Sequence, residues 1–158
     1  MAENGPSTLT ETIGLIFRAM RGLLVVLNSV IILFALFFVF SGKNLGGEKL
    51  QMVPWLRWIY CLTIISTAIY GIVVSLWTGK KCKFHLKMIM VYLILIALLT
   101  LIGIILSAVY VRKPTKYDII FIVGSCFIMF ILTTTTITFG YALKKTKLFR
   151  RMNMFSSS

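Results

Sequence analysis

The sequence predicts an all-α membrane protein: an antiparallel bundle of four transmembrane helices with short loops. Four apolar runs, at 22–40, 58–77, 88–111 and 119–143, contain no Asp, Glu, Lys, Arg or His. Each has 19 to 25 residues, which at about 1.5 Å per residue crosses a hydrocarbon layer of about 30 Å. The mean hydropathy of +0.96 exceeds that of soluble domains, and a bilayer accepts only helices or closed barrels.

Residues 1–21 precede the first run and are predicted to be a cytoplasmic amphipathic segment. The apolar residues of this segment recur at the spacing of one helix face: Leu9, Ile13, Ile16, Phe17 and Met20. Glu11 and Arg18 fall on the opposite face. Two interpretations fit this pattern: a short helix in the cytoplasmic interface, or an extension of the first span with a bend at Gly22.

The first span contains Asn28, the most polar residue in any of the four runs. An amide in hydrocarbon requires a hydrogen-bonding partner, so we expect Asn28 to bond to another helix. A ligand contact is the alternative, which is less favoured because no charged residue accompanies it in the span.

Small residues in the second and third runs predict that these two helices contact each other. In the second run and just after it they recur every four residues, at Thr67, Gly71, Ser75 and Gly79. The third run has its own set, at Thr100, Gly103 and Ser107. Helices associate in lipid where small side chains let their backbones approach closely.

The fourth span contains a threonine run at 133–136, followed by Thr138. In a helix these hydroxyls bond to the carbonyls of the preceding turn and need line nothing. An anion or water path along them is the alternative.

The three cysteines lead to different predictions. Cys61 and Cys126 lie in the second and fourth spans, where either a disulfide or two buried thiols are conceivable. Cys82 is flanked by lysines in the second loop, 78–87, which is predicted to be cytoplasmic and also contains His85. This position suits palmitoylation, and an unmodified thiol fits equally well.

The distribution of basic residues predicts the orientation. Eleven of the 17 lie in the amino-terminal segment, the second loop and the tail, and six lie in the other two loops. The positive-inside rule therefore places both termini in the cytoplasm. Of the eleven, eight are predicted to face anionic lipid: Lys80, Lys81, Lys83, Lys144, Lys145, Lys147, Arg150 and Arg151. For the tail, 144–158, specific phosphoinositide recognition is the alternative to a plain topology signal.

The titratable residues do not form a catalytic or metal-binding set. The chain has one His and four acids, and all five lie outside the apolar runs. General acid–base catalysis needs titratable groups that converge, and a metal site needs several ligands. We therefore expect no enzyme activity and no cofactor. The net charge of +13 is divided among short loops beside the spans, so lipid is a better partner than nucleic acid.

The order of these features resembles a tetraspanin over about residues 20–111. The segments that carry the resemblance are the Asn-containing first span (LLVVLNSVIILFALFFVFSG, 23–42), the small-residue end of the second (YGIVVSLWTG, 70–79), the short basic loop with Cys82, and the end of the third (LLTLIGIILSAVY, 98–110). The large second extracellular domain of that family is absent. The resemblance implies a four-helix bundle and favours the plasma membrane.

Two functions from different classes fit the sequence. We favour a non-catalytic membrane adaptor or auxiliary subunit that associates laterally with another integral membrane protein. The alternative is a self-assembling channel or cell-junction component, a homo-oligomer whose basic outer loops select anions.

Overall fold

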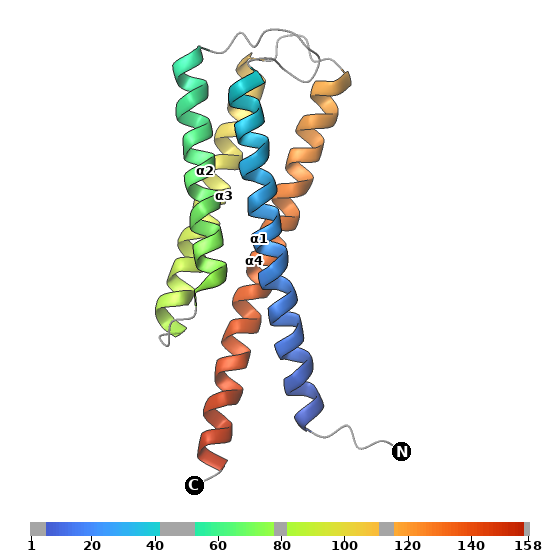
Figure 1. The fold of residues 1–158 in the computed structure, drawn as a ribbon, viewed down its shortest axis with the longest axis vertical. Coiled ribbons are helices and arrows are strands. Elements are labelled where there is room, and N and C mark those ends of the chain that lie inside the picture. The colour runs from blue at the N-terminus through green and yellow to red at the C-terminus, as the bar shows by residue number, and fades with distance from the viewer. Residues whose placement is uncertain (1–5, 42–52, 78–81, 111–115, 157–158) are drawn as a thin grey trace.

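The computed structural model of the chain is helical, with no strand among the residues that it describes, which are 6–41, 53–77, 82–110 and 116–156. In chain order the helices are α1 (Pro6–Ser41), α2 (Pro54–Leu76), α3 (Cys82–Tyr110) and α4 (Lys116–Ser156), shown in Figure 1. Each contains a stretch long and apolar enough to cross a bilayer. The predicted helical class is therefore confirmed, and the chain has the length and composition of an integral multi-pass membrane protein.

Two of the helices are much longer than a membrane requires. α1 has 36 residues and α4 has 41, or about 54 and 62 Å at 1.5 Å per residue. α1 continues without interruption through Gly22, so the amino-terminal segment extends the first span. Both long helices project past α2 and α3 at the end where the chain termini lie (Figure 1). We call this the terminal end of the bundle.

α2 begins and ends for identifiable local reasons. Pro54 occupies its first turn, where the missing N–H costs nothing because that N–H would have no partner within the helix. The Val53 carbonyl accepts the first bonds, from the N–H groups of Leu56 at 3.1 Å and Arg57 at 3.2 Å. At the other end Trp77 adopts an extended conformation, with φ of −60° and ψ of 123°, so the helix stops at Leu76.

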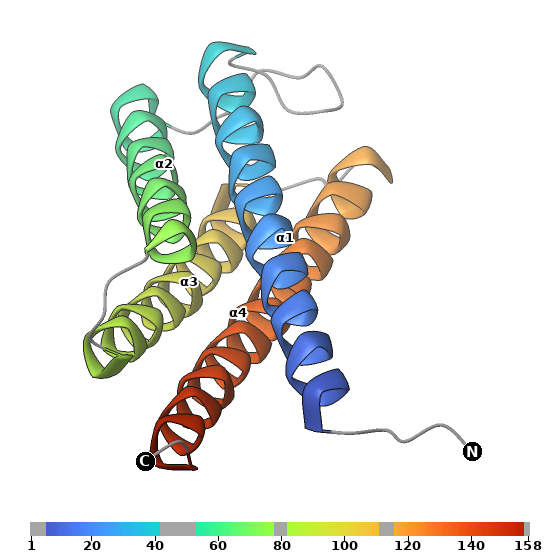
Figure 2. The same ribbon diagram turned by 60° about the horizontal axis from the view of Figure 1, so that its bottom comes forward.

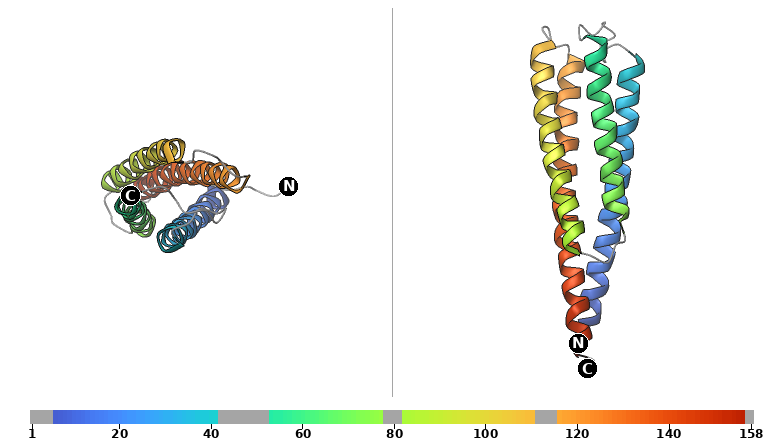
Figure 3. Two further views of the ribbon diagram at one scale, coloured as in Figure 1. Left: turned by 90° about the horizontal axis from the view of Figure 1, so that it is seen from above. Right: turned by 90° about the vertical axis from the view of Figure 1, so that its left-hand side faces the viewer.

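The four helices form a closed ring of neighbours. α1 packs against α2 and α4, and α3 packs against the same two, so that α1 and α3 lie diagonally across the bundle from each other. Figure 3 shows the bundle from above and from the side. α1 and α4 cross near their middles and their lower ends diverge (Figures 1 and 2).

All four helices contribute to one apolar core. Its fully buried members are Leu24, Val74, Ile89, Tyr92, Ile96, Leu132, Phe139 and Leu143. Only 22% of the most apolar window of α1 and of α3 is buried inside the bundle. Most of the surface of these spans is therefore apolar and directed outward, as expected in lipid.

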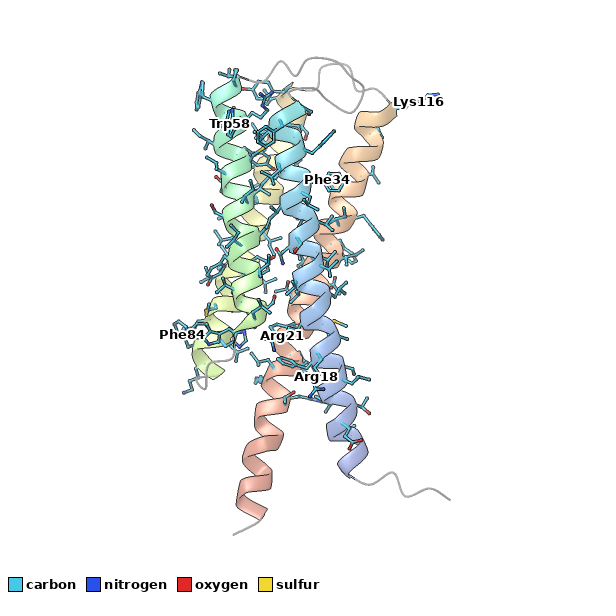
Figure 4. All side chains as sticks on the ribbon, in the orientation of Figure 1. Arg18, Arg21, Phe34, Trp58, Phe84 and Lys116 are labelled. Carbon is cyan, nitrogen blue, oxygen red and sulfur yellow. The ribbon has the colours of Figure 1, made fainter. Side chains whose placement is uncertain are left out.

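Aromatic side chains pack together near both ends of the bundle. Figure 4 shows Trp58 at the upper end of the bundle and Phe84 near the terminal end. Trp58 packs edge-on against Phe40 at 6.3 Å between ring centroids, and Phe84 packs against Trp77 at 5.8 Å. Trp58 and Trp77 are 19 positions apart, about 28 Å along a helix, which is close to the thickness of a bilayer core.

Candidate functional site

A hydrogen bond across the diagonal of the bundle joins two fully buried polar side chains. The Tyr92 hydroxyl of α3 donates to Asn28 Oδ1 of α1 at 2.5 Å, and both residues are 1% exposed. Asn28 Nδ2 donates in turn to the Leu24 carbonyl at 2.8 Å. We call this pair the Asn28–Tyr92 latch. The described backbones of α1 and α3 do not approach each other closely, and the long side chain of Tyr92 spans the distance between them.

Gly71 of α2 provides the space that the latch needs. A Cβ atom at this position would lie 2.4 Å from both Cζ and Oη of Tyr92, well inside van der Waals contact. The Tyr70 ring lies beside Tyr92 with 6.3 Å between centroids, and its hydroxyl donates to the Met88 carbonyl at 3.4 Å. Two consecutive residues of α2 therefore lie against the Tyr92 ring.

A second tyrosine and glycine repeat this arrangement at the other end of the same helix pair, with the roles of the helices exchanged. Tyr60 of α2 lies over Gly103 of α3, where a Cβ atom would be 2.5 Å from the tyrosine oxygen. The Tyr60 hydroxyl donates to the Leu99 carbonyl at 3.4 Å. Two glycines that we had predicted as packing residues thus face a tyrosine on the opposite helix.

The other predicted packing residues satisfy their polar groups within their own helices. Thr67 and Ser75 are buried, and their hydroxyls donate to the carbonyls four residues earlier at 2.9 and 2.7 Å. Thr100 does the same at 2.8 Å, and Ser107 is half-buried. Gly79 lies outside the described residues.

The last turn of α2 is capped by side chains from two neighbouring helices. His85 Nε2 of α3 donates to the Val74 carbonyl at 2.7 Å, and Arg21 Nη2 of α1 donates to the Leu76 carbonyl at 3.0 Å. A helix leaves its last four carbonyls without partners of its own. A carbonyl only accepts, so Nε2 carries the proton in this bond.

Aromatic rings from α1 and α4 enclose this cap. Phe139 is fully buried, stacks on Phe17 with 5.1 Å between centroids, and presents its ring to His85 at 5.8 Å. All four helices therefore meet at one level near the terminal end. His85, 1% exposed, is part of the core at that level.

The position of His85 corrects our expectation that it lies in the second loop. α3 begins at Cys82, so His85 lies in its first turns. Lys83 and Lys87 delimited the predicted apolar run, but both are exposed and do not interrupt the helix. The spacing of His85 from later apolar residues could have indicated that it belongs to the buried face of the helix. It precedes four buried residues by 4, 7, 11 and 14 positions, which is a helical period: Ile89, Tyr92, Ile96 and Leu99.

The threonines of α4 form the local bonds that their sequence predicted. All five donate to the carbonyl four residues earlier, at 2.7 to 2.9 Å: Thr133, Thr134, Thr135, Thr136 and Thr138. Thr135 and Thr136 are buried in the bundle, whereas Thr134 is exposed on its outer surface. The threonines thus lie on more than one side of the helix, and each hydroxyl donates to a carbonyl of its own helix.

The cysteines and the basic residues are only partly described. Cys61 is buried and Cys126 is exposed, and both are free thiols. Lys83, Lys144 and Lys145 are exposed, with the Lys145 ammonium 5.1 Å from the centroid of the Tyr141 ring. Two further predicted positions, Lys80 and Lys81, lie outside the described residues. For four others the structure describes the helix but not the side chain: Cys82, Lys147, Arg150 and Arg151.

The polar side chains of the latch and the cap hydrogen-bond to each other or to backbone carbonyls, and these bonds position the helices. Among the described residues no group of three or more His, Cys, Asp or Glu could hold a metal ion. The latch and the cap instead connect α3 to α1 and α2 through hydrogen bonds in an apolar interior, where such bonds fix the register of neighbouring helices. No protein-family model, curated protein or solved structure matches this chain.

Proposed function

We propose that this protein is a non-catalytic four-helix membrane adaptor or auxiliary subunit that associates laterally with a larger integral membrane protein. The observation that carries the proposal is the contrast between the interior and the outer faces. The interior polar groups of the latch and the cap bond within the chain. Large apolar side chains are exposed along all four helices, and such surfaces in a membrane contact either lipid or another protein.

The proposed orientation is an antiparallel bundle with both termini in the cytoplasm. It is supported by the eleven basic residues in the segments assigned to that side, against six in the other two loops. A membrane-impermeant maleimide should label a single cysteine introduced as Asn44→Cys from outside intact cells. It should not label one introduced as Ser157→Cys; the reverse pattern would exclude this orientation.

The tetraspanin-like features extend the proposal. The resemblance favours the plasma membrane and a four-helix bundle, and it supports no specific partner because the domain through which tetraspanins generally engage partners has no counterpart here. Cys82, flanked by lysines at the cytoplasmic boundary, is the proposed palmitoylation site. An acyl chain there would strengthen the attachment of the terminal end to the inner leaflet.

A photo-crosslinking scan in the native membrane tests lateral association. A benzophenone amino acid is placed at one exposed site on each helix, at Leu33, Ile69, Ile104 and Phe130. The buried Leu132, 2% exposed, is the control. We expect one or two adjacent sites to give a defined adduct with a larger heterologous membrane protein, and the control to give none.

Two outcomes would contradict the adaptor role. Adducts with lipid alone at all four exposed sites would indicate that the outer faces have no protein partner. A ladder of adducts between copies of this chain, ending at a fixed number, would instead support the self-assembling channel or junction component.

A further inference from the structure

A groove on the outer surface of α3 begins at the terminal end and runs toward the middle of the membrane. The groove is shallow and open on its outer side, with a volume of about 530 Å³, and its lining comes from α3 alone: Lys83, Leu86, Lys87, Met90, Val91 and Ile94. These positions recur at intervals of three and four, so they lie on one side of the helix.

The groove is polar at one end only. The ammonium groups of Lys83 and Lys87, both exposed, lie at the end where α3 begins. The other four lining residues are apolar, and none of the four acidic residues of the chain lies in α3. The positive end of the helix dipole is on the same side as the lysines and adds to the attraction for an anion.

The groove also has the depth of one leaflet. Lys83 and Ile94 are 11 positions apart, or about 16 Å along the helix, and half of a hydrocarbon core is about 15 Å. The neighbouring Phe84 and Trp77 pack together and are half exposed, 50% and 40%. Aromatic side chains of this kind sit at the headgroup level, which places the lysines beside lipid phosphates and Ile94 near the bilayer centre.

From this geometry we infer that the α3 groove binds one anionic phospholipid of the leaflet at the terminal end, with its headgroup on Lys83 and Lys87 and an acyl chain along Met90, Val91 and Ile94. The lysines select a negative headgroup, and the apolar groove orders the chain that follows it. The groove is distinct from the latch and the cap, which lie inside the bundle. Its occupancy does not depend on the adaptor role.

Native mass spectrometry of the purified full-length protein tests this site. The protein is reconstituted in vesicles of phosphatidylcholine and phosphatidylserine at 4:1, extracted in mild detergent and weighed with its retained lipid. We expect one phosphatidylserine per chain, retained in preference to phosphatidylcholine. The double variant Lys83→Gln/Lys87→Gln should lose at least about fivefold of this retention, because a basic residue near a membrane surface contributes about that factor to the attraction.

Matched variants distinguish lipid binding in the groove from the general attraction between a basic protein and an anionic membrane. Lys144→Gln/Lys145→Gln removes the same charge from exposed positions on α4 and should keep the bound lipid. Val91→Trp fills the groove without changing charge and should lower retention, whereas Ile104→Trp, at an exposed position on the same helix, should not. All these positions are exposed, and monodisperse elution of each variant checks that it folds.

Three results would overturn the proposal. Equal loss in the two lysine double variants would show attraction to the membrane surface in general. Equal retention of phosphatidylcholine would show that the lysines do not select the headgroup. Complete displacement by water-soluble glycerophosphoserine would show a headgroup site without an acyl-chain groove.

Discussion

Tyr92 and Gly71 depend on each other at the scale of single residues. In most helices Gly→Ala stabilises by up to about 1 kcal/mol because alanine is the better helix former. At Gly71 the added methyl would lie 2.4 Å from the ring of a fully buried tyrosine. We expect Gly71→Ala to destabilise the bundle by about 1 to 3 kcal/mol, the usual cost of overpacking. Reversible unfolding in mixed micelles measures this change.

The control for this prediction is Gly22→Ala in α1. No atom lies within 4 Å of a Cβ built at Gly22, so only the gain in helix propensity remains. The double variant Gly71→Ala/Tyr92→Leu should recover part of the lost stability, because leucine lacks the ring atoms that the added methyl would meet. A Gly71→Ala protein as stable as the control would contradict the close approach of Tyr92.

The latch itself is testable through a double-mutant cycle. Tyr92→Phe keeps the ring but leaves Asn28 Oδ1 without its donor in an apolar interior, and we expect a loss of about 1 kcal/mol. With Asn28→Val as the second variant, the coupling energy should be about 0.6 to 2 kcal/mol. Tyr141→Phe, on an exposed ring, should change stability by less than about 0.5 kcal/mol. A coupling energy near zero would remove the latch from the account.

The sequence predicted one partner of each tyrosine–glycine pair and missed the other. Asn28, Gly71 and Gly103 were identifiable because amides and small residues are exceptional within apolar runs. Tyr60 and Tyr92 were not identifiable in this way. Tyrosine is common at both membrane boundaries, and the residues around it in the sequence do not show whether its ring is buried in the bundle or lies at the headgroup level. The pairing depends on which residues of two neighbouring helices lie at the same level, and that register is set by tertiary packing.

At the scale of the helix, the cap on α2 links its stability to two other helices. His85→Leu removes the donor to the Val74 carbonyl, which has no substitute within the last turn of α2. We expect amide exchange in residues 72–76 to accelerate about tenfold, as the loss of a bond contributing about 1 to 1.5 kcal/mol would produce. Met90→Leu, an exposed apolar replacement on the same helix, is the control. Unchanged exchange in the His85 variant would mean that the cap does not hold this turn.

Helix type was predictable from the sequence, but helix length was not. Apolar runs identify spans because hydrocarbon excludes charge, yet helices continue wherever charged side chains reach water. Lys83 and Lys87 lie on the exposed side of α3, where their alkyl stems and charged ends are compatible with the boundary. For the same reason α4 extends through the basic tail to Ser156, past the end of the apolar run at residue 143.

At the scale of the whole molecule, the bundle combines a bonded interior with an apolar outer surface. The latch, the two tyrosine–glycine pairs and the cap connect α1, α2 and α3, and the Phe139 ring packs α4 against Phe17 and His85. The outer faces carry large exposed apolar side chains on all four helices, and such side chains contact lipid or other proteins in a membrane. The proposed adaptor role depends on this combination of a bonded interior and an apolar outer surface.

The most direct test is the mass of the particle that carries this chain when it is excised from its native membrane with an amphipathic polymer and no detergent. The adaptor account predicts particles that contain this chain together with one larger, heterologous membrane protein in a constant ratio. Particles that contain only a single copy of the chain and lipid, or a closed ring of copies alone, would contradict it.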